Sequence, residues 1–297
     1  MARKPVYYGG QAVLEGVMIR GPSSMAVVCR RPDGGLAVHS ERLSGLYVGT
    51  ARRIPFVRGI IILWETLVLG MRALFFSSNV ALEEEEKEAG AGAMLLPGLI
   101  SLVVVAGVFF AGPVFLAGWL EGAIDNDYAV VAIEGVIRLL LLIAYIWFIG
   151  LMPDIKRVFA YHGAEHKAIH ALEAGDALVP DAVQRYEKAH VRCGTSFLLT
   201  VMIVAIVVFT AMGAPDLWLR VLSRIVLIPV VAAISYELIR LSARYEHTAI
   251  VRWLMKPNLA LQGLTTREPS EDQVEVAIRA LNEVLKTEGM EPSEARA

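Results

Sequence analysis

Four apolar runs, each long enough to cross a lipid bilayer as a helix, constrain the fold of this chain more than any other feature. A transmembrane helix needs about 20 consecutive apolar residues. Of the 297 residues, 56% are hydrophobic and only 20% are charged, which is too apolar for a soluble domain of this size. The sequence therefore predicts a polytopic α-helical protein of the cell (inner or plasma) membrane. The runs cover 94–120 and 128–152, within segment 94–152, and 196–213 and 217–239, within segment 196–242.

The distribution of lysine and arginine predicts how these helices are oriented, because cytoplasmic loops are enriched in basic residues. Residues 1–58 hold nine basic residues, whereas the connection 121–127 holds acidic residues and no lysine or arginine. Segment 153–195 and the residues that follow the fourth run are basic as well. We therefore expect both termini and segment 153–195 in the cytoplasm, which agrees with an even number of spans.

A further apolar run, residues 54–78, is interrupted by charges and allows two interpretations. Arg58, Glu65 and Arg72 recur every seven residues, which places them on one stripe of a helix. We predict an amphipathic helix, interfacial or re-entrant, whose charged stripe faces water or lipid head groups. The alternative is a fifth span, which would place the two termini on opposite sides of the membrane. An acidic linker that includes residues 83–88 completes segment 54–93.

The N-terminal segment, residues 1–53, predicts a small cytoplasmic β-containing domain. Two β-prone runs flank a Pro-Asp-Gly-Gly turn at residues 32–35, which is a strong hairpin signal. The stretch at 11–22 before them predicts a third strand.

The C-terminal segment, residues 243–297, predicts an amphipathic cytoplasmic helix. Ser270 and Gln273 form a capping-box pattern, and apolar residues follow at helical spacing. We expect this helix to dock on the N-terminal domain.

The predicted cytoplasmic segment 153–195 concentrates residue types that bind metals. His162 and His166 lie four residues apart, so on a helix they face the same way and can hold one zinc-sized ion. Glu165 completes the order H-x-x-E-H, which is that of the inverted zinc peptidases, where the glutamate is the base for a metal-activated water. We therefore predict His162 and His166 as ligands of a divalent metal, with zinc favoured, and Glu165 as the catalytic base.

Other residues of the same segment are candidates to complete the metal shell. Glu173 returns to the same helix face, whereas His170 lies about 12 Å of helix rise from His162, which argues against all three histidines holding one ion. His190 and Cys193 follow three residues apart and offer an imidazole and a thiolate, both good zinc ligands. Glu173 or Cys193 is predicted to complete the shell, with His190 as a further candidate.

The same residues also have a simpler interpretation. A five-residue H-x-x-E-H pattern occurs by chance in many proteins, and histidines near a membrane surface are often only solvated or paired with lipid phosphate. Glu237, near the cytoplasmic end of the fourth run, has either a functional role or an ion pair with Arg240. The residues alone leave these alternatives open.

Several motifs along the chain together resemble one family. They are YYGGQAVLEGVMIRGP, VRGIIILWETLVLGMRAL, YHGAEHKAIHALEAG, RCGTSF, ISYELIRL and LQGLTTREP followed by VEVAI. In these motifs the chain is similar, over nearly its whole length, to the YqhQ family of bacterial membrane proteins. That family is a domain of unknown function whose members are often labelled metal-dependent enzymes.

The resemblance implies a metal-dependent activity and adds candidate residues from the N-terminal block. Glu15 and Arg20 of that block form either a surface ion pair, which contributes little, or part of a cap over the histidine segment. The residues that match the family motifs are His162, Glu165, His166, Glu173, Cys193, Glu237, Glu15 and Arg20.

Together these features predict a metal-dependent membrane enzyme, hydrolytic if the metal is zinc, with its site at the cytoplasmic membrane face. Its partners would be the lipid bilayer and a lipid-linked or membrane-peptide substrate. Homo-oligomerisation stays open, and no nucleic-acid partner is expected.

Two alternatives come from other functional classes. The first is a non-catalytic membrane scaffold or assembly factor with a structural His/Glu/Cys cluster, which a closed four-ligand shell would favour. The second is an ion or small-solute transporter, which would require charged groups deep within several spans. Only Glu134 and Arg138 meet that requirement here, and their spacing of four residues allows them to pair.

Overall fold

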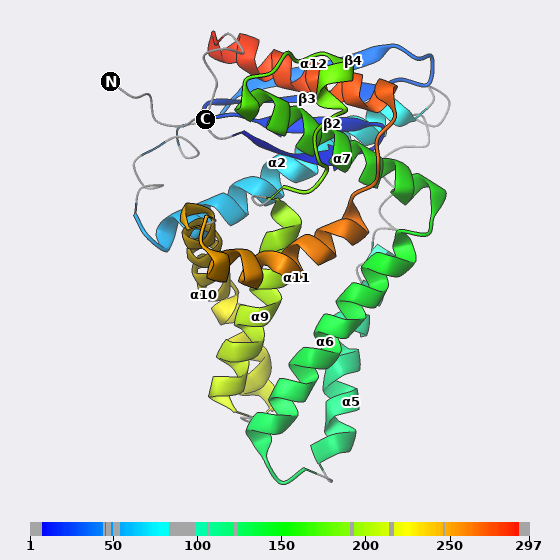
Figure 1. Cartoon of the computed structure of the whole chain (residues 1–297). Coiled ribbons are helices and arrows are strands. Elements are labelled where there is room, and N and C mark those ends of the chain that lie inside the picture. The colour runs from blue at the N-terminus through cyan, green and yellow to red at the C-terminus, as the bar shows by residue number, and fades with distance from the viewer. Residues whose placement is uncertain are drawn as a thin grey trace.

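The computed structural model describes residues 8–43, 45, 49, 54–82, 124–190, 193–213, 217–245 and 247–290, together with most of 99–121. Its upper part is a small antiparallel sheet with helices on both faces, and its lower part is a bundle of long helices (Figure 1). This mostly helical fold with a small N-terminal sheet agrees with the predicted fold class. The acidic run predicted as a linker, 83–88, lies outside the described residues.

Four strands form the sheet in chain order, each antiparallel to the next. The turn predicted at 32–35 joins the last two strands. The prediction of one strand at 11–22 was wrong, because this stretch forms two strands joined by a tight turn at Leu14 and Glu15. That turn lacks the Asn-Gly or Asp-Gly pair that usually marks a two-residue hairpin, and Glu15 adopts a φ of 50° there. The strands are β1 (Gly9–Val13), β2 (Gly16–Arg20), β3 (Ser24–Arg30) and β4 (Leu36–Arg42).

Both faces of the sheet are buried against helices. Successive residues of a strand point to opposite faces, and here neighbours in sequence belong to different cores. Val17 and Ile19 of β2 pack on one side with α7 (Pro153–Ala174) and α12 (Glu271–Glu288). Met18 packs on the other side with α2 (Val57–Ala81). A sheet covered on both sides therefore has apolar runs in place of strict alternation.

The helix α12 covers one face of the sheet, as predicted from its amphipathic pattern. It begins at the predicted capping box, in which the backbone N–H of Ser270 donates to the side chain of Gln273 (3.0 Å). In its last turn, Glu288 accepts from the backbone N–H of Ser23 (2.7 Å), just before β3. The C-terminal helix and the N-terminal sheet thus form one unit.

The first half of the predicted cytoplasmic segment 153–195 is the helix α7, as the spacing of its histidines suggested. This helix begins at a proline, which is favoured in the first turn, and ends before Gly175, whose φ of 75° suits glycine. It packs on β1 and α12. A Cβ atom at Gly163 would lie 2.2 Å from the carbonyl oxygen of Arg267, so a side chain there would push α7 off the segment before α12. The short helix α8 (Pro180–Val183) follows.

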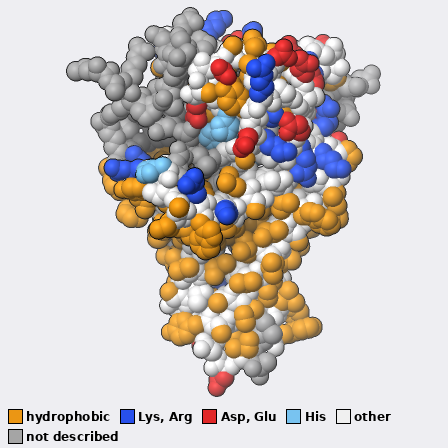
Figure 2. Space-filling view, viewed as in Figure 1, with side chains coloured by type: hydrophobic (Ala, Val, Ile, Leu, Met, Phe, Trp, Pro, Cys, Tyr) orange, Lys and Arg blue, Asp and Glu red, His pale blue; other side chains and the backbone are white. Residues whose placement is uncertain are grey.

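The lower part of the molecule is built from the predicted apolar runs. Within it, α6 packs against α5 and α9, and α9 packs against α10. Figure 2 shows hydrophobic side chains over this part, whereas charged side chains gather on the upper part. The helices are α5 (Gly112–Glu121), which follows a π-helical turn at Gly107–Ala111, α6 (Asp127–Ile149), α9 (Gly194–Met212) and α10 (Leu217–Arg244).

Five helices among the described residues are long and apolar enough to cross a membrane. Four of them correspond to the predicted runs. The fifth is α2, so length and composition alone do not distinguish the interfacial interpretation of this helix from the fifth span.

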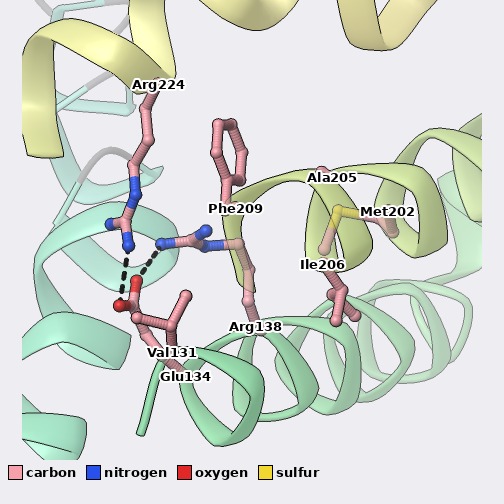
Figure 3. A pocket seen from close by; sticks show the side chains of 9 residues that line it. Val131, Glu134, Arg138, Met202, Ala205, Ile206, Phe209 and Arg224 are labelled. Carbon is pink, nitrogen blue, oxygen red and sulfur yellow. Dashed lines mark hydrogen bonds and ion pairs between the residues drawn. The ribbon is translucent and has the colours of Figure 1, made fainter. Parts of the chain in front are cut away.

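A group of charges lies inside the bundle (Figure 3). Glu134 of α6 is only 1% exposed, and it accepts from Arg138 (2.8 Å) one turn further on, as its spacing suggested. It also accepts from Arg224 of α10 (2.7 Å), a partner that sequence spacing could not reveal. The three side chains line a small cavity of about 30 Å³ and connect α6 to α10.

The helix α2 runs across between the sheet and the bundle, and its charged stripe holds it there (Figure 1). The prediction that this stripe faces water or lipid head groups was wrong for Arg58 and Glu65, which are largely buried in pairs with other elements, whereas Arg72 is paired but its side chain remains 60% exposed. Leu69 and Ala73 add apolar contacts with the sheet, and Gly59 approaches Ala233 of α10 closely. The pairs are Arg58 with Glu237 of α10, Glu65 with Arg20 of β2 (2.7 Å), and Arg72 with Glu41 of β4 (3.2 Å).

The helix α11 (Ala249–Thr265), which was not among the predicted elements, also runs across the molecule, beside α9 (Figure 1). Its inner side buries Leu261 and Gln262, whereas its outer side exposes large apolar residues such as Trp253. The sequence pattern that could have predicted α11 is the amphipathic spacing of its apolar residues, but Pro257 inside the helix argued against a continuous helix.

The Arg20–Glu65 pair predicts a stability difference within the stripe of α2. Glu65 is 3% exposed, and breaking a buried ion pair costs about 3 kcal/mol or more. Glu65→Ala should therefore lower the free energy of unfolding by about 3 kcal/mol. Arg72→Ala is the matched control, because the Arg72 side chain is 60% exposed and its pair should contribute less than about 1 kcal/mol. Thermal unfolding of the purified variants measures both, and equal effects would contradict the buried pair.

Candidate metal centre

The face of α7 that carries its histidines is turned toward the segment between α8 and α9. His162, His166 and His170 recur every four residues and so form a row along the helix. The row is continuous in space, with ring centroids 4.4 Å apart for His162 and His166. His190 from the facing segment lies 4.6 Å from the ring of His170. Two groups of potential metal ligands result.

The first group, called the His162 cluster, consists of His162, His166 and Cys193. One ligand atom from each lies within 4.8 Å of the others. Cys193 is the N-cap residue of α9, and its sulfur accepts from the backbone N–H of Thr195 (3.5 Å). The sequence prediction that Cys193 joins the two histidines thus has a matching geometry.

Backbone carbonyls orient both imidazoles of the His162 cluster. Nδ1 of His162 lies 2.9 Å from the carbonyl oxygen of Thr265, and Nδ1 of His166 lies 2.6 Å from that of Lys188. A carbonyl oxygen can only accept, so each Nδ1 donates, and Nε2 is the nitrogen of each ring that could bind a metal. Nε2 of His162 faces the sulfur of Cys193 at 3.1 Å. This support of imidazoles by carbonyl groups is typical of metal-binding histidines.

The second group, called the His170 cluster, consists of His170, Glu173 and His190, again with one ligand atom of each within 4.8 Å of the others. Glu173 was a candidate third ligand for His162 and His166, but it lies in this group instead. Burial is the main effect that lowers the pKa of His190 below its ordinary value, which favours the neutral imidazole that metals require.

Glu165, the predicted base, is 3% exposed and lies beside the His162 cluster. Its carboxylate is 3.8 Å from Nε2 of His166 and 4.0 Å from Nε2 of His162. Burial raises the pKa of Glu165 to about 7, although His162 and a hydrogen bond from the backbone N–H of Gly10 partly oppose this effect. A carboxyl group that titrates near neutral pH is suited to accept and return a proton.

The remaining predicted site residues lie outside both clusters. Glu15 does not pair with Arg20; it accepts from Arg157 of α7 (2.6 Å), and this contact lowers the pKa of Glu15. Arg20 binds Glu65. The N-terminal block does approach the site, but through the backbone of Gly10. Glu237 pairs with Arg58 of α2, so of its two interpretations the structural ion pair is present, but with Arg58 in place of Arg240.

Three residues that were not among the predicted site residues support the clusters. They are Gly10, Gln262 and Thr265, which contact Glu165, His190 and His162 respectively. All three lie within motifs of the family resemblance, and that was the only available signal for them.

The fold and this site define a class of protein. A sheet with helices on both faces is joined to a bundle of apolar helices, and two groups of potential metal ligands lie where α7, on one face of the sheet, meets the segment before α9. The chain belongs to DUF1385, a family of proteins of unknown function, whose model matches residues 54–287.

The chain is also similar to a protein of Bacillus subtilis (strain 168) described as "Uncharacterized protein YqhQ". The two are 39% identical over 300 residues, which cover 96% of this chain and 94% of the relative. No solved structure matches the chain. The predicted YqhQ resemblance is therefore confirmed, and neither description names an activity.

The contact between Gly10 and Glu165 generates a prediction about the site. A Cβ atom at Gly10 would lie 2.2 Å from the carbonyl oxygen of Met18 and 3.1 Å from Cγ of Glu165. Gly10→Ala should therefore destabilise the protein by about 1–3 kcal/mol, the usual effect of overpacking. Gly9→Ala is the matched control, because its Cβ would meet no atom within 4 Å. Thermal unfolding compares the two, and a neutral Gly10→Ala would contradict the close approach of β1 to Glu165.

Proposed function

We propose that this chain is a metal-dependent hydrolytic enzyme whose site is the His162 cluster together with Glu165. Among the described residues, three glutamates are buried: Glu65, Glu134 and Glu165. Glu65 and Glu134 each have an arginine partner, whereas no described lysine or arginine forms an ion pair with Glu165. A buried carboxylate without a cation is costly, so its retention beside three potential ligands supports a functional role.

The chemistry follows from the donor set. His162, His166 and Cys193 would hold the metal, and two imidazoles with a thiolate favour zinc. Zinc held there would act as a Lewis acid and make water more acidic. Glu165 would accept the proton that water loses and return it to the leaving group. Three ligands leave a fourth tetrahedral position open, which supports catalysis over a purely structural role.

We further propose that the chain is a multi-pass membrane protein with the site at the cytoplasmic surface. The outer sides of α2 and α11 expose large apolar residues, among them Trp64 and Trp253, and tryptophan is enriched at membrane interfaces. Leu69 and Ala73 of α2 pack on the sheet. If α2 crossed the bilayer, this contact would place the sheet inside the bilayer, so it favours four spans with α2 in the interface. Cys193 is the N-cap residue of α9, which is one of the proposed spans, so the site would lie at the membrane surface. A substrate held by the membrane, either a lipid-linked compound or a membrane peptide, would reach it there.

The second candidate function is a membrane scaffold with structural metal sites. It is favoured by the burial of His166 and Cys193 and by the way the clusters connect α7 to the segment before α9. A scaffold requires the ligands and does not require a base. Glu165 therefore distinguishes the two candidates.

A metal ligand and a catalytic base should respond differently to substitution. His166→Ala should lose most of the bound metal at the His162 cluster, because one of three ligands is removed. Glu165→Gln keeps the shape but cannot accept a proton, so it should retain the metal and fail in a cellular complementation assay. Metal analysis of purified wild type and both variants, with complementation in a deletion strain, checks this. Full complementation by Glu165→Gln would favour the scaffold, and wild type that takes up no metal would remove the enzyme proposal.

The proposed topology predicts opposite labelling of two exposed aspartates. Asp125→Cys lies in the connection between α5 and α6 and should react with a membrane-impermeant thiol reagent in intact cells. Asp181→Cys lies in α8 and should react only after the membrane is opened. The native cysteines, Cys29 and Cys193, are buried, so the unsubstituted protein gives the background. Labelling of Asp181→Cys from outside would contradict the topology.

A further inference from the structure

The His170 cluster offers a second set of metal ligands that the proposed function does not use. His170 and Glu173 lie three residues apart on α7, and His190 faces them from the segment before α9. Their ligand atoms lie within 4.8 Å of one another. Zinc–nitrogen and zinc–oxygen bonds are about 2.0–2.2 Å long, so small side-chain movements would bring all three atoms onto one ion.

The surrounding residues hold these side chains in place. Nε2 of His170 lies 2.8 Å from the carbonyl oxygen of Ala189, so it donates and leaves the lone pair on Nδ1. Gln262 holds the main chain of His190 on both sides, since its Oε1 accepts from the His190 N–H (2.6 Å) and its Nε2 donates to the His190 carbonyl (2.9 Å). Gln262 is completely buried. Such a supporting shell limits the movement of the ligands and favours binding.

One ion cannot serve both clusters. His162 and His170 are eight residues apart on α7, which corresponds to a rise of about 12 Å. The two clusters also differ in chemistry, because a thiolate belongs to the first and a carboxylate to the second. Soft thiolate selects zinc, whereas two imidazoles and one carboxylate also accept iron or manganese.

We propose that His170, Glu173 and His190 form a second site for a divalent transition-metal ion, separate from the His162 cluster. The inference goes beyond the proposed function, which requires one metal only. An ion pair between the carboxylate of Glu173 and Nε2 of His190 (3.6 Å) would explain two of the three residues without a metal, and it is the competing outcome of the test.

Cobalt titration of the purified full-length protein distinguishes the sites, because a thiolate ligand adds a sulfur-to-cobalt charge-transfer band. Wild type should bind two equivalents, of which one produces this band. His170→Ala and Glu173→Gln should each bind one equivalent and keep the band. Cys193→Ser should lose the band and keep one equivalent. His39→Ala is the matched control, since His39 is exposed and belongs to neither cluster, and it should bind two equivalents.

Other results would overturn the second site. Wild type that binds a single equivalent, lost in Cys193→Ser and retained in both His170→Ala and Glu173→Gln, would contradict the second site and leave the proposed function standing. A single equivalent without the charge-transfer band, lost in His170→Ala, would support the second site and contradict the first. Wild type that binds no cobalt would overturn both.

Discussion

The sheet has to be covered on both faces, and this requirement arranges the helices around it. Met18 and Ile19 are neighbours in β2, yet they are buried in different cores. One core needs α7 and α12, and the other needs α2. Since α2 also binds α10 through Arg58 and Glu237, covering the sheet fixes its position on the bundle. The site on α7 is positioned as a consequence, because β1 packs directly on that helix.

Charges that are buried in this protein indicate which contacts are structural. The pairs Arg20–Glu65 and Arg138–Glu134 join elements or neighbouring helix turns, and each carboxylate is matched by a guanidinium. Glu165 is buried to a similar degree, but its neighbours are imidazoles and a backbone N–H. The buried carboxyl group of Glu165 therefore has to be either protonated or close to a cation such as a metal ion. This difference separates Glu165 from the other buried glutamates and supports its assignment as a reacting group.

The two clusters depend on contacts between distant segments. The row of histidines on α7 supplies only part of each donor set, and the rest comes from the segment before α9. The carbonyl of Thr265 and the side chain of Gln262 then orient His162 and His190 from α11. A helix that the sequence did not predict is therefore part of the support for both clusters. Its contribution explains how ligands in a connecting segment can be held at fixed positions.

The sequence by itself determined the elements whose signals are local. Length and hydrophobicity identified the apolar helices, the capping box at Ser270 marked the start of α12, and the spacing of four residues placed His162 and His166 on one face. Only the tertiary structure decided which partners these residues meet. Arg58 and Glu65 of the α2 stripe are largely buried because their partners lie on α10 and β2, whereas Arg72 pairs with β4 and stays largely exposed. Glu173 belongs with His170 and His190 because the segment before α9 crosses α7 at that level. Helix periodicity defines a face, but the neighbour that packs on it depends on the path of the whole chain.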